Sequence, residues 1–112
     1  MKKFKTHNDG IDWKVSIGTG LLDYLTIPYD IIVKTFGEPG ESDGYKVDAE
    51  WEIEFEDGNV ATIYNYKSGK NYLGEKGIPT KDIKEWNIGG RKRSVVKDVI
   101  DILNDTLEKE GI

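Results

Sequence analysis

Carboxylates are the most numerous side chains of this chain that could do chemistry. Glu50, Glu52 and Glu54 alternate with apolar residues, so a strand would present them on one face at intervals of about 7 Å. That spacing approaches the separation of paired acid and base carboxylates and of divalent-metal ligands. The same alternation is typical of a solvated strand face, which we favour because nothing in the sequence buries one carboxyl to raise its pKa. With Asp48, these glutamates form a candidate acidic face for protein binding or nucleic-acid mimicry.

Nucleophilic and metal chemistry lack most of the residues they need. The chain has one histidine, His7, and no cysteine. Neither a histidine-containing triad nor a histidine or thiolate metal centre can be assembled from them, although a serine and lysine pair stays open. No serine lies in a nucleophile-elbow motif. We therefore expect a binding protein with no catalytic residue, no metal and no cofactor.

A basic segment offers a candidate anion site. Gly89, Gly90, Arg91 and Arg93 stand directly before a predicted helix. At a helix N-terminus, free backbone N–H groups and the helix dipole favour a phosphate or an acidic partner. The segment lacks the spacing of a P-loop, and a Gly-Gly pair before a helix is also ordinary loop chemistry. A plain loop with solvated cations therefore stays the alternative.

A third cluster combines aromatic rings, amides and lysines over residues 64–72. Such side chains can stack a base and hold its phosphates. The candidates are Tyr64, Asn65, Lys67, Lys70, Asn71 and Tyr72, with Trp86 expected nearby in the sheet. Tyr64 and Tyr66 are two positions apart on a predicted strand, so we expect both rings to face the core.

The central element that positions these groups is a predicted β-hairpin. Two alternating runs, residues 46–56 and 59–67, flank Asp57-Gly58. Asp-Gly predicts a two-residue type I′ turn, which suits the twist of the flanking strands. This turn would place Trp51 opposite Tyr64 on an inner face and leave the glutamates on a wet outer face.

The remaining elements complete a β-β-α-β-β-β-α order. Turn residues and apolar spacing separate them. They are strands over 11–17 and 21–26, a helix over 28–36, a long connection over 68–80, a strand over 83–88 and a helix from an N-cap at Ser94 to about Lys109. The order predicts one α+β domain over residues 1–112, with two helices on one face of a mainly antiparallel sheet.

Charge is distributed unevenly along the 112 residues. The net charge is −5, yet residues 41–66 hold one lysine against eight acids, and residues 67–97 hold nine lysines and arginines against three acids. An acidic total disfavours direct binding to duplex nucleic acid, while a local anion site stays open. No apolar run approaches a membrane span and no signal-peptide core follows the N-terminus. We expect no membrane association and, because cysteine is absent, a cytoplasmic location.

Four sequence blocks together resemble a group of small accessory proteins of tailed bacteriophages and prophages. They are residues 27–39, which contain Phe-Gly-Glu-Pro, residues 45–51, residues 57–67, and residues 86–90, Trp-Asn-Ile-Gly-Gly. The resemblance covers most of residues 20–103. Phage proteins of this size are often inhibitors of bacterial immunity. The resemblance thus implies an anti-defence or anti-CRISPR protein of the host cytoplasm that acts by stoichiometric binding.

Two binding mechanisms are compatible with this interpretation. In the first, the acidic face docks on the basic nucleic-acid groove of a host defence protein and gains association rate from charge complementarity. In the second, the tyrosine cluster and the basic segment hold a nucleotide-derived immune signal. The alternative function is a phage structural or regulatory module that binds another protein. A homo-oligomer stays open in each case.

Overall fold

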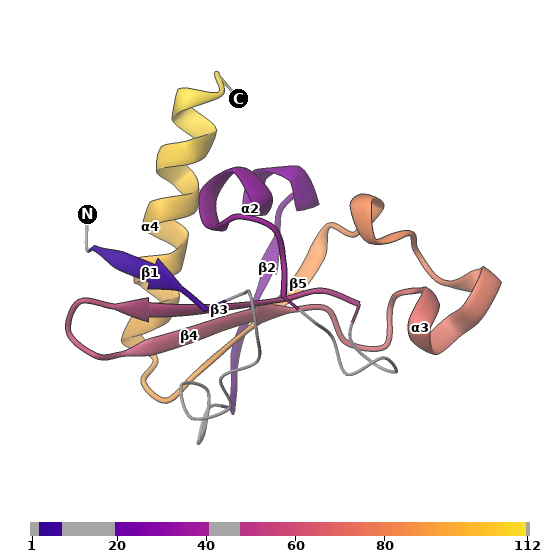
Figure 1. Ribbon diagram of the computed structural model, residues 1–112, viewed down its shortest axis with the longest axis horizontal. Helices are drawn as coiled ribbons and strands as arrows, with labels where there is room; N and C mark the ends of the chain where they lie inside the picture. The colour runs from indigo at the N-terminus through magenta and orange to yellow at the C-terminus, as the bar shows by residue number, and fades with distance from the viewer. Residues whose placement is uncertain (1–2, 8–19, 41–47, 112) are drawn as a thin grey trace.

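Five strands form one antiparallel sheet, and two helices pack on one of its faces (Figure 1). The computed structural model describes residues 3–7, 20–40 and 48–111. The predicted α+β class is therefore confirmed. The first predicted strand, over 11–17, lies outside the described residues.

The sheet has the order β1-β3-β4-β5-β2, and each neighbouring pair is antiparallel. Its strands are β1 (Phe4–Thr6), β2 (Gly20–Thr26), β3 (Glu50–Phe55), β4 (Val60–Tyr64) and β5 (Glu85–Gly90). The sequence did not predict β1, which pairs with β3. β2 and β5 are neighbours although a helix and the central hairpin separate them along the chain.

The two longer helices begin and end close to the predicted residues. α2 spans Tyr29–Phe36 and α4 spans Ser94–Lys109. α2 stops at Gly37, whose φ of +86° favours glycine. Arg93 occupies the N-cap position of α4 without a side-chain cap, so the predicted Ser94 cap is wrong. In the described part of the chain, no helix has the length and apolar character needed to cross a lipid bilayer.

The predicted long connection contains short helical turns. α3 (Lys70–Leu73) is followed by the 3₁₀ turns η1 (Gly74–Lys76) and η2 (Thr80–Asp82). None of them has a buried side chain. They project away from the sheet at the end opposite α4 (Figure 1).

Two tryptophans form the centre of the core between sheet and helices. The rings of Trp51 and Trp86 are buried and meet edge to face, with centroids 5.3 Å apart. Each indole N–H donates to a backbone carbonyl, that of Trp51 to Gly37 at 2.8 Å and that of Trp86 to Ile27 at 3.0 Å. Both rings are therefore fully satisfied inside the core. Trp86 is a core residue and is not placed to stack on a ligand.

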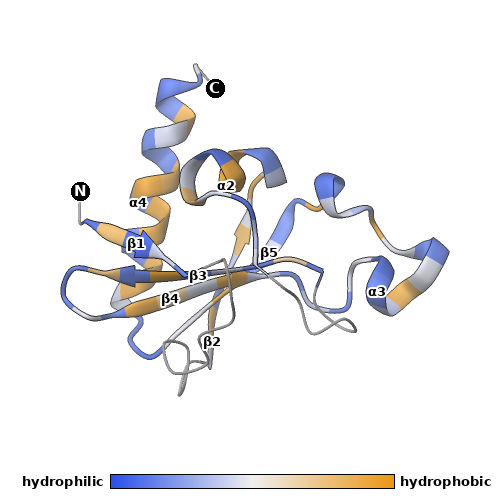
Figure 2. Ribbon diagram, in the orientation of Figure 1, coloured by the Kyte–Doolittle hydropathy of each residue, from blue (hydrophilic) through white to orange (hydrophobic). Residues whose placement is uncertain are grey.

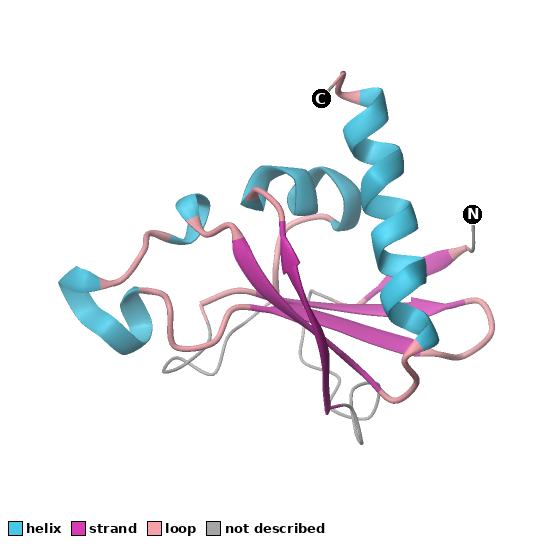
Figure 3. Cartoon of the chain, turned by 180° about the vertical axis from the view of Figure 1, so that it is seen from behind, coloured by secondary structure: helices cyan, strands magenta, loops and turns pink. Residues whose placement is uncertain are grey.

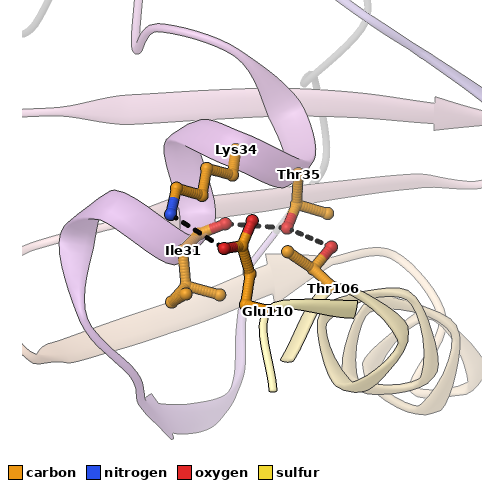
Figure 4. A network of polar contacts seen from close by, with 5 residues as sticks. All are labelled: Ile31, Lys34, Thr35, Thr106 and Glu110. Atoms are coloured by element: carbon orange, nitrogen blue, oxygen red, sulfur yellow. Dashed lines mark hydrogen bonds and ion pairs between the residues drawn. The ribbon is translucent and has the colours of Figure 1, made fainter. Parts of the chain in front are cut away.

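The apolar stripe of α4 completes this core, as predicted. Figure 3 shows the helix lying over the sheet, and Figure 2 shows its hydrophobic stripe. Its buried members are Val95, Val96, Val99, Ile102 and Leu103. Beyond the sheet, α2 and α4 also share polar contacts (Figure 4). The hydroxyl of Thr35 donates to the carbonyl of Ile31, and its oxygen lies 2.8 Å from the hydroxyl oxygen of Thr106. Lys34 Nζ lies 3.2 Å from a carboxylate oxygen of Glu110.

The central hairpin closes with a three-residue loop, so the predicted two-residue type I′ turn is wrong. The N–H of Phe55 donates to the carbonyl of Asn59 at 2.8 Å, and the N–H of Gly58 donates back to Phe55 at 2.9 Å. Gly58 has a φ of +85°, whereas Asp57 does not have a positive φ. This is a type I turn followed by a left-handed glycine. Its additional loop residue shifts β4 by one position against β3.

The shift exchanges the two faces of β4, because side chains alternate along a strand. Trp51 pairs with Ile63 instead of Tyr64, and Tyr64 pairs with Glu50. Tyr64 therefore lies on the outer face with the glutamates. Tyr66 is 49% exposed. The expectation that both tyrosines face the core is wrong.

The outer face of the sheet is also less exposed to solvent than predicted. Glu52 on β3 is 4% exposed, and Val60 and Thr62 on β4 are 4% and 3% exposed. Glu50 and Glu54 are half-buried. The interpretation of a fully solvated acidic face is therefore wrong at its centre.

Candidate functional site

Three tyrosines gather on the outer face around one asparagine. Tyr24 on β2 and Tyr64 on β4 both pair in register with Asn87 of β5, from its two sides. Tyr66 follows Tyr64 by two residues, and its phenol is close enough to influence the pKa of Tyr64. Pairing of β2 with β5 thus brings together aromatic residues that are far apart along the chain.

A groove of about 370 Å³ lies beside these rings. We call it the tyrosine groove, and it is lined by Tyr24, Leu25, Thr26, Tyr66, Ser68, Glu85, Trp86 and Asn87. Tyr24 is 69% exposed and Tyr66 is 49% exposed, so both rings are accessible from solvent. Exposed aromatic rings with a few polar groups are typical of small-ligand sites, and the volume is near the lower end for such sites.

Tyr64 supports the groove as a neutral hydrogen-bonding group. Burial raises the pKa of its phenol above the usual 10.0, a hydrogen bond with Asn87 opposes this rise, and the nearby Glu50 carboxylate adds to it. The phenol therefore keeps its proton at neutral pH. It can orient Asn87, but it is not activated as a nucleophile.

Lys67 places a cation beside the groove. Its backbone has a φ of +59°, a left-handed conformation that is uncommon for a residue with a side chain. Its Nζ lies 5.3 Å from the ring centroid of Tyr66 and 5.4 Å from that of Tyr72. These are cation–π distances. The ammonium group can therefore meet an anionic part of a ligand that rests on Tyr66.

Two of the predicted binding residues, Asn65 and Asp48, are hydrogen-bonded to each other. Asn65 is 1% exposed, and its Oδ1 accepts hydrogen bonds from the N–H groups of Asp48 at 2.7 Å and Ala49 at 3.1 Å. Its Nδ2 donates to Asp48 Oδ1 at 3.0 Å, while Asp48 Oδ2 accepts from the N–H of Asn71 at 3.2 Å. Asn65 and Asp48 therefore fix the shape of the loop. Lys70, Asn71 and Tyr72 are exposed beyond it.

The other predicted acidic residues are engaged within the molecule or buried. Glu54 Oε1 lies 2.9 Å from His7 Nε2 and 3.7 Å from Lys5 Nζ. Glu52 is buried, and Glu50 lies near the phenol of Tyr64. These carboxylates do not form a continuous solvated row.

Gly89 and Gly90 lie within β5 and not in a loop before the helix. A Cβ atom at Gly89 would stand 2.5 Å from Thr62 Oγ1, and one at Gly90 would stand 2.8 Å from Val95 Cγ2. Close packing on both faces of the strand therefore explains the two glycines. They are not arranged as a phosphate-binding loop.

The structure separates the basic segment from the tyrosine cluster. Gly90 pairs with Ala61 at one end of β4, while Asn87 pairs with Tyr64 at the other end. Lys67 and Arg91 therefore follow strand ends at opposite edges of the β4–β5 pair. Arg91 is exposed. The two sets do not form one site.

Arg93 contacts β2 through both terminal nitrogens of its guanidinium group. Its Nη1 donates to the carbonyl of Leu22 at 2.8 Å, and its Nη2 lies 3.2 Å from Asp23 Oδ2. The side chain thereby links the start of α4 to an outer strand of the sheet. This structural role competes with the predicted phosphate contact.

The sequence predicted Tyr64 and Lys67, which lie beside the groove, but of the eight residues that line the groove it named only Trp86. Tyr24, Glu85 and Asn87 all lie on predicted strands. An aromatic or polar residue at an outward position of a strand is a usable signal for binding. Nothing in the local sequence indicates that β2 lies next to β5, so these residues could not be assembled into one site.

The described residues provide no group of metal ligands. Across residues 3–7, 20–40 and 48–111, no three His, Asp or Glu side chains are grouped so that they could hold a metal ion. No protein-family model matches the chain, and no curated protein matches it. Among the described residues, the tyrosine groove is the feature best suited to hold a small ligand.

Proposed function

We propose that this protein acts by stoichiometric binding and holds a nucleotide-derived ligand in the tyrosine groove. The observation that carries the proposal is the pair of exposed rings, Tyr24 and Tyr66, that line one groove together with Asn87. A planar base gains about 1–3 kcal/mol by stacking on an aromatic side chain. Tyrosine also loses little conformational entropy when it binds, because it has only two side-chain torsions.

The polar groups suit a base inside the groove and a phosphate outside it. The carboxylate of Glu85 and the amide of Asn87 can accept hydrogen bonds from the amino group of a base. Glu85 would repel a phosphate at the same position. Lys67, whose Nζ lies 5.3 Å from the Tyr66 ring, offers the favourable place for the anionic group.

The biological setting of the proposal comes from the resemblance to small phage proteins. A nucleotide-binding protein of this type would sequester an immune signal in the host cytoplasm and would need no turnover. The competing mechanism, docking of an acidic face on a basic groove, is less well supported. Glu52 is buried, and the Glu54 carboxylate is half-buried and contacts His7 at 2.9 Å, so the row of exposed carboxylates that this mechanism requires is broken.

A thermal-shift screen against cyclic dinucleotides, cyclic trinucleotides and ADP-ribose derivatives tests the proposal. A ligand at a hundred times its Kd adds about 2.7 kcal/mol to the free energy of unfolding, which is a clear shift in Tm. We expect Tyr66→Ala and Tyr24→Ala each to weaken binding of a positive ligand by about 5-fold to 100-fold, measured by calorimetry.

Leu21→Ala is the matched control. Leu21 is 50% exposed on the same strand as Tyr24 but does not line the groove. It should leave the Kd unchanged. A screen without any shift, or a shift that survives in the Tyr24→Ala and Tyr66→Ala double variant, would contradict the proposal. Recovery of converted product in place of intact ligand would show that the protein is an enzyme.

A further inference from the structure

Apolar side chains are exposed on the long loop between β4 and β5. We call residues 68–78, which contain α3 and η1, the arm. Tyr72 is 38% exposed, Leu73 is 45% exposed and Ile78 is 44% exposed. Every residue from 70 to 76 is exposed, so the helical turns of the arm bury no side chain. Figure 2 shows hydrophobic colour recurring here, away from the helices that cover the sheet.

Backbone contacts fix the shape of the arm. Gly69 and Ile78 form a parallel bridge, and the N–H of Ile78 donates to the carbonyl of Ser68 at 3.1 Å. The two sides approach so closely that a Cβ atom on Gly77 would stand 2.4 Å from the backbone of Gly69. Asp48 also accepts a hydrogen bond from Asn71 N–H. The arm is therefore preorganised although it has no core of its own.

The arm carries positive charge on an acidic protein. The arm itself contains two lysines, Lys70 and Lys76, and one acid, Glu75, whereas the whole chain has a net charge of −5. Lys67 and Lys81 flank the arm, and Asp82 follows Lys81. All of these side chains are exposed. Four lysines therefore lie within the arm or next to it along the chain, against two acids.

We propose that the arm is a docking element that inserts Leu73 and Ile78 into an apolar cleft rimmed by acidic residues on a partner protein. Charge complementarity with these lysines identifies the acidic rim. A preformed protrusion binds without a large entropic penalty for ordering the loop. Leu73 and Ile78 do not line the tyrosine groove, although Ser68 lines it and Lys67 lies beside it. The docking proposal does not depend on the nucleotide proposal.

A protein partner fits the arm better than a nucleic acid. Leu73 and Ile78 are aliphatic and cannot stack on bases as aromatic rings do. The acidic total charge would also repel a polyanion. An apolar centre with a polar rim is instead the usual arrangement of a protein interface.

Selection from a random 16-residue peptide display library on the immobilised full chain tests the proposal. The selected peptides should combine Asp or Glu with large apolar residues. Fluorescence anisotropy with the best synthetic peptide should give a Kd at least 10-fold weaker for Leu73→Ser and for Lys70→Glu. Both positions are exposed, and circular dichroism will verify that the variants fold.

The controls are Leu21→Ser and Lys92→Glu, which change an exposed leucine and an exposed lysine at other places. Neither should alter the Kd. Selected peptides that lack acidic residues, peptides whose binding is unaffected by the arm variants, or the absence of any arm-dependent binder would overturn the proposal. Binding of a dT15 oligonucleotide through Lys70 and Leu73, without peptide binding, would show that the arm recognises nucleic acid instead.

Discussion

Asn65 and Asp48 are joined by two hydrogen bonds of opposite direction. The N–H of Asp48 donates to Asn65 Oδ1 at 2.7 Å, and Asn65 Nδ2 donates to Asp48 Oδ1 at 3.0 Å. Asn65 follows β4 and Asp48 precedes β3, so this pair closes the open end of the hairpin. Asp48 also contacts Asn71, which connects the hairpin to the arm. One buried amide therefore supports both proposed binding surfaces.

Asn65→Ala should lower the free energy of unfolding by about 2–4 kcal/mol, because it leaves the partly buried N–H of Asp48 and the buried N–H of Ala49 without their acceptor. Urea denaturation measures the change. Ser68→Ala is the control, since its contact with Asn65 is long at 3.4 Å, and it should cost less than about 0.5 kcal/mol. A loss below about 1 kcal/mol for Asn65→Ala would contradict this structural role.

Gly58→Ala should destabilise the protein by about 1 kcal/mol, and Gly58→Asn by less, because asparagine tolerates the left-handed region better than alanine. Gly58 has a φ of +85° and no other atom within 4 Å of a Cβ atom added there. Backbone strain is therefore the only expected effect. Equal stability of Gly58→Ala and the unchanged protein, measured by thermal denaturation, would contradict the left-handed backbone conformation of Gly58.

The sequence correctly predicted which side chains of β3 face the core, but it predicted the wrong pairing register between β3 and β4. On β3, charged and apolar residues alternate, and the predicted inward residues Trp51, Ile53 and Phe55 are buried. On β4, residues 60–64 carry no charge, so either face suits the core. The loop length then decides the register, and one additional residue moves every side chain to the other face. An Asp-Gly pair is compatible with both loop lengths.

The candidate site was predictable only where its residues are neighbours in the chain. Tyr64 and Lys67 were identified from local composition. Asn87 and Tyr24 join them only because β2 adds to the sheet beside β5. Gly-Gly-Arg before a helix predicted an anion site, but Gly89 is a packing residue inside a strand. Sequence spacing does not distinguish a glycine required by a ligand from one required by a neighbouring side chain.

Gly89→Ala should destabilise the protein by about 1–3 kcal/mol, because the added methyl group meets Thr62 Oγ1 and the carbonyl of Gly20. Gly20→Ala is a matched control on the neighbouring strand, where a Cβ atom would meet nothing within 4 Å. It should be neutral or slightly stabilising. Chemical denaturation compares the two, and equal effects would show that Gly89 is not a packing residue.

The stability of the protein should fall with pH in the alkaline range because of Tyr64. Burial raises the pKa of its phenol above the value of about 10.0 that it has in the unfolded chain. Between these two pKa values the unfolded chain has lost the proton and the folded chain still holds it. Deprotonation therefore favours unfolding, and the contribution of the neutral phenol is complete below pH about 9.

Burial, with a smaller effect of Glu38, also raises the pKa of Tyr29, which adds a fall of the same sign. Tyr64→Phe should consequently give a shallower decrease in the free energy of unfolding between pH 8 and 11, measured by urea denaturation at each pH and referred to the difference at pH 7. Parallel curves for Tyr64→Phe and the unchanged protein would mean that the phenol of Tyr64 titrates alike in the folded and unfolded chains.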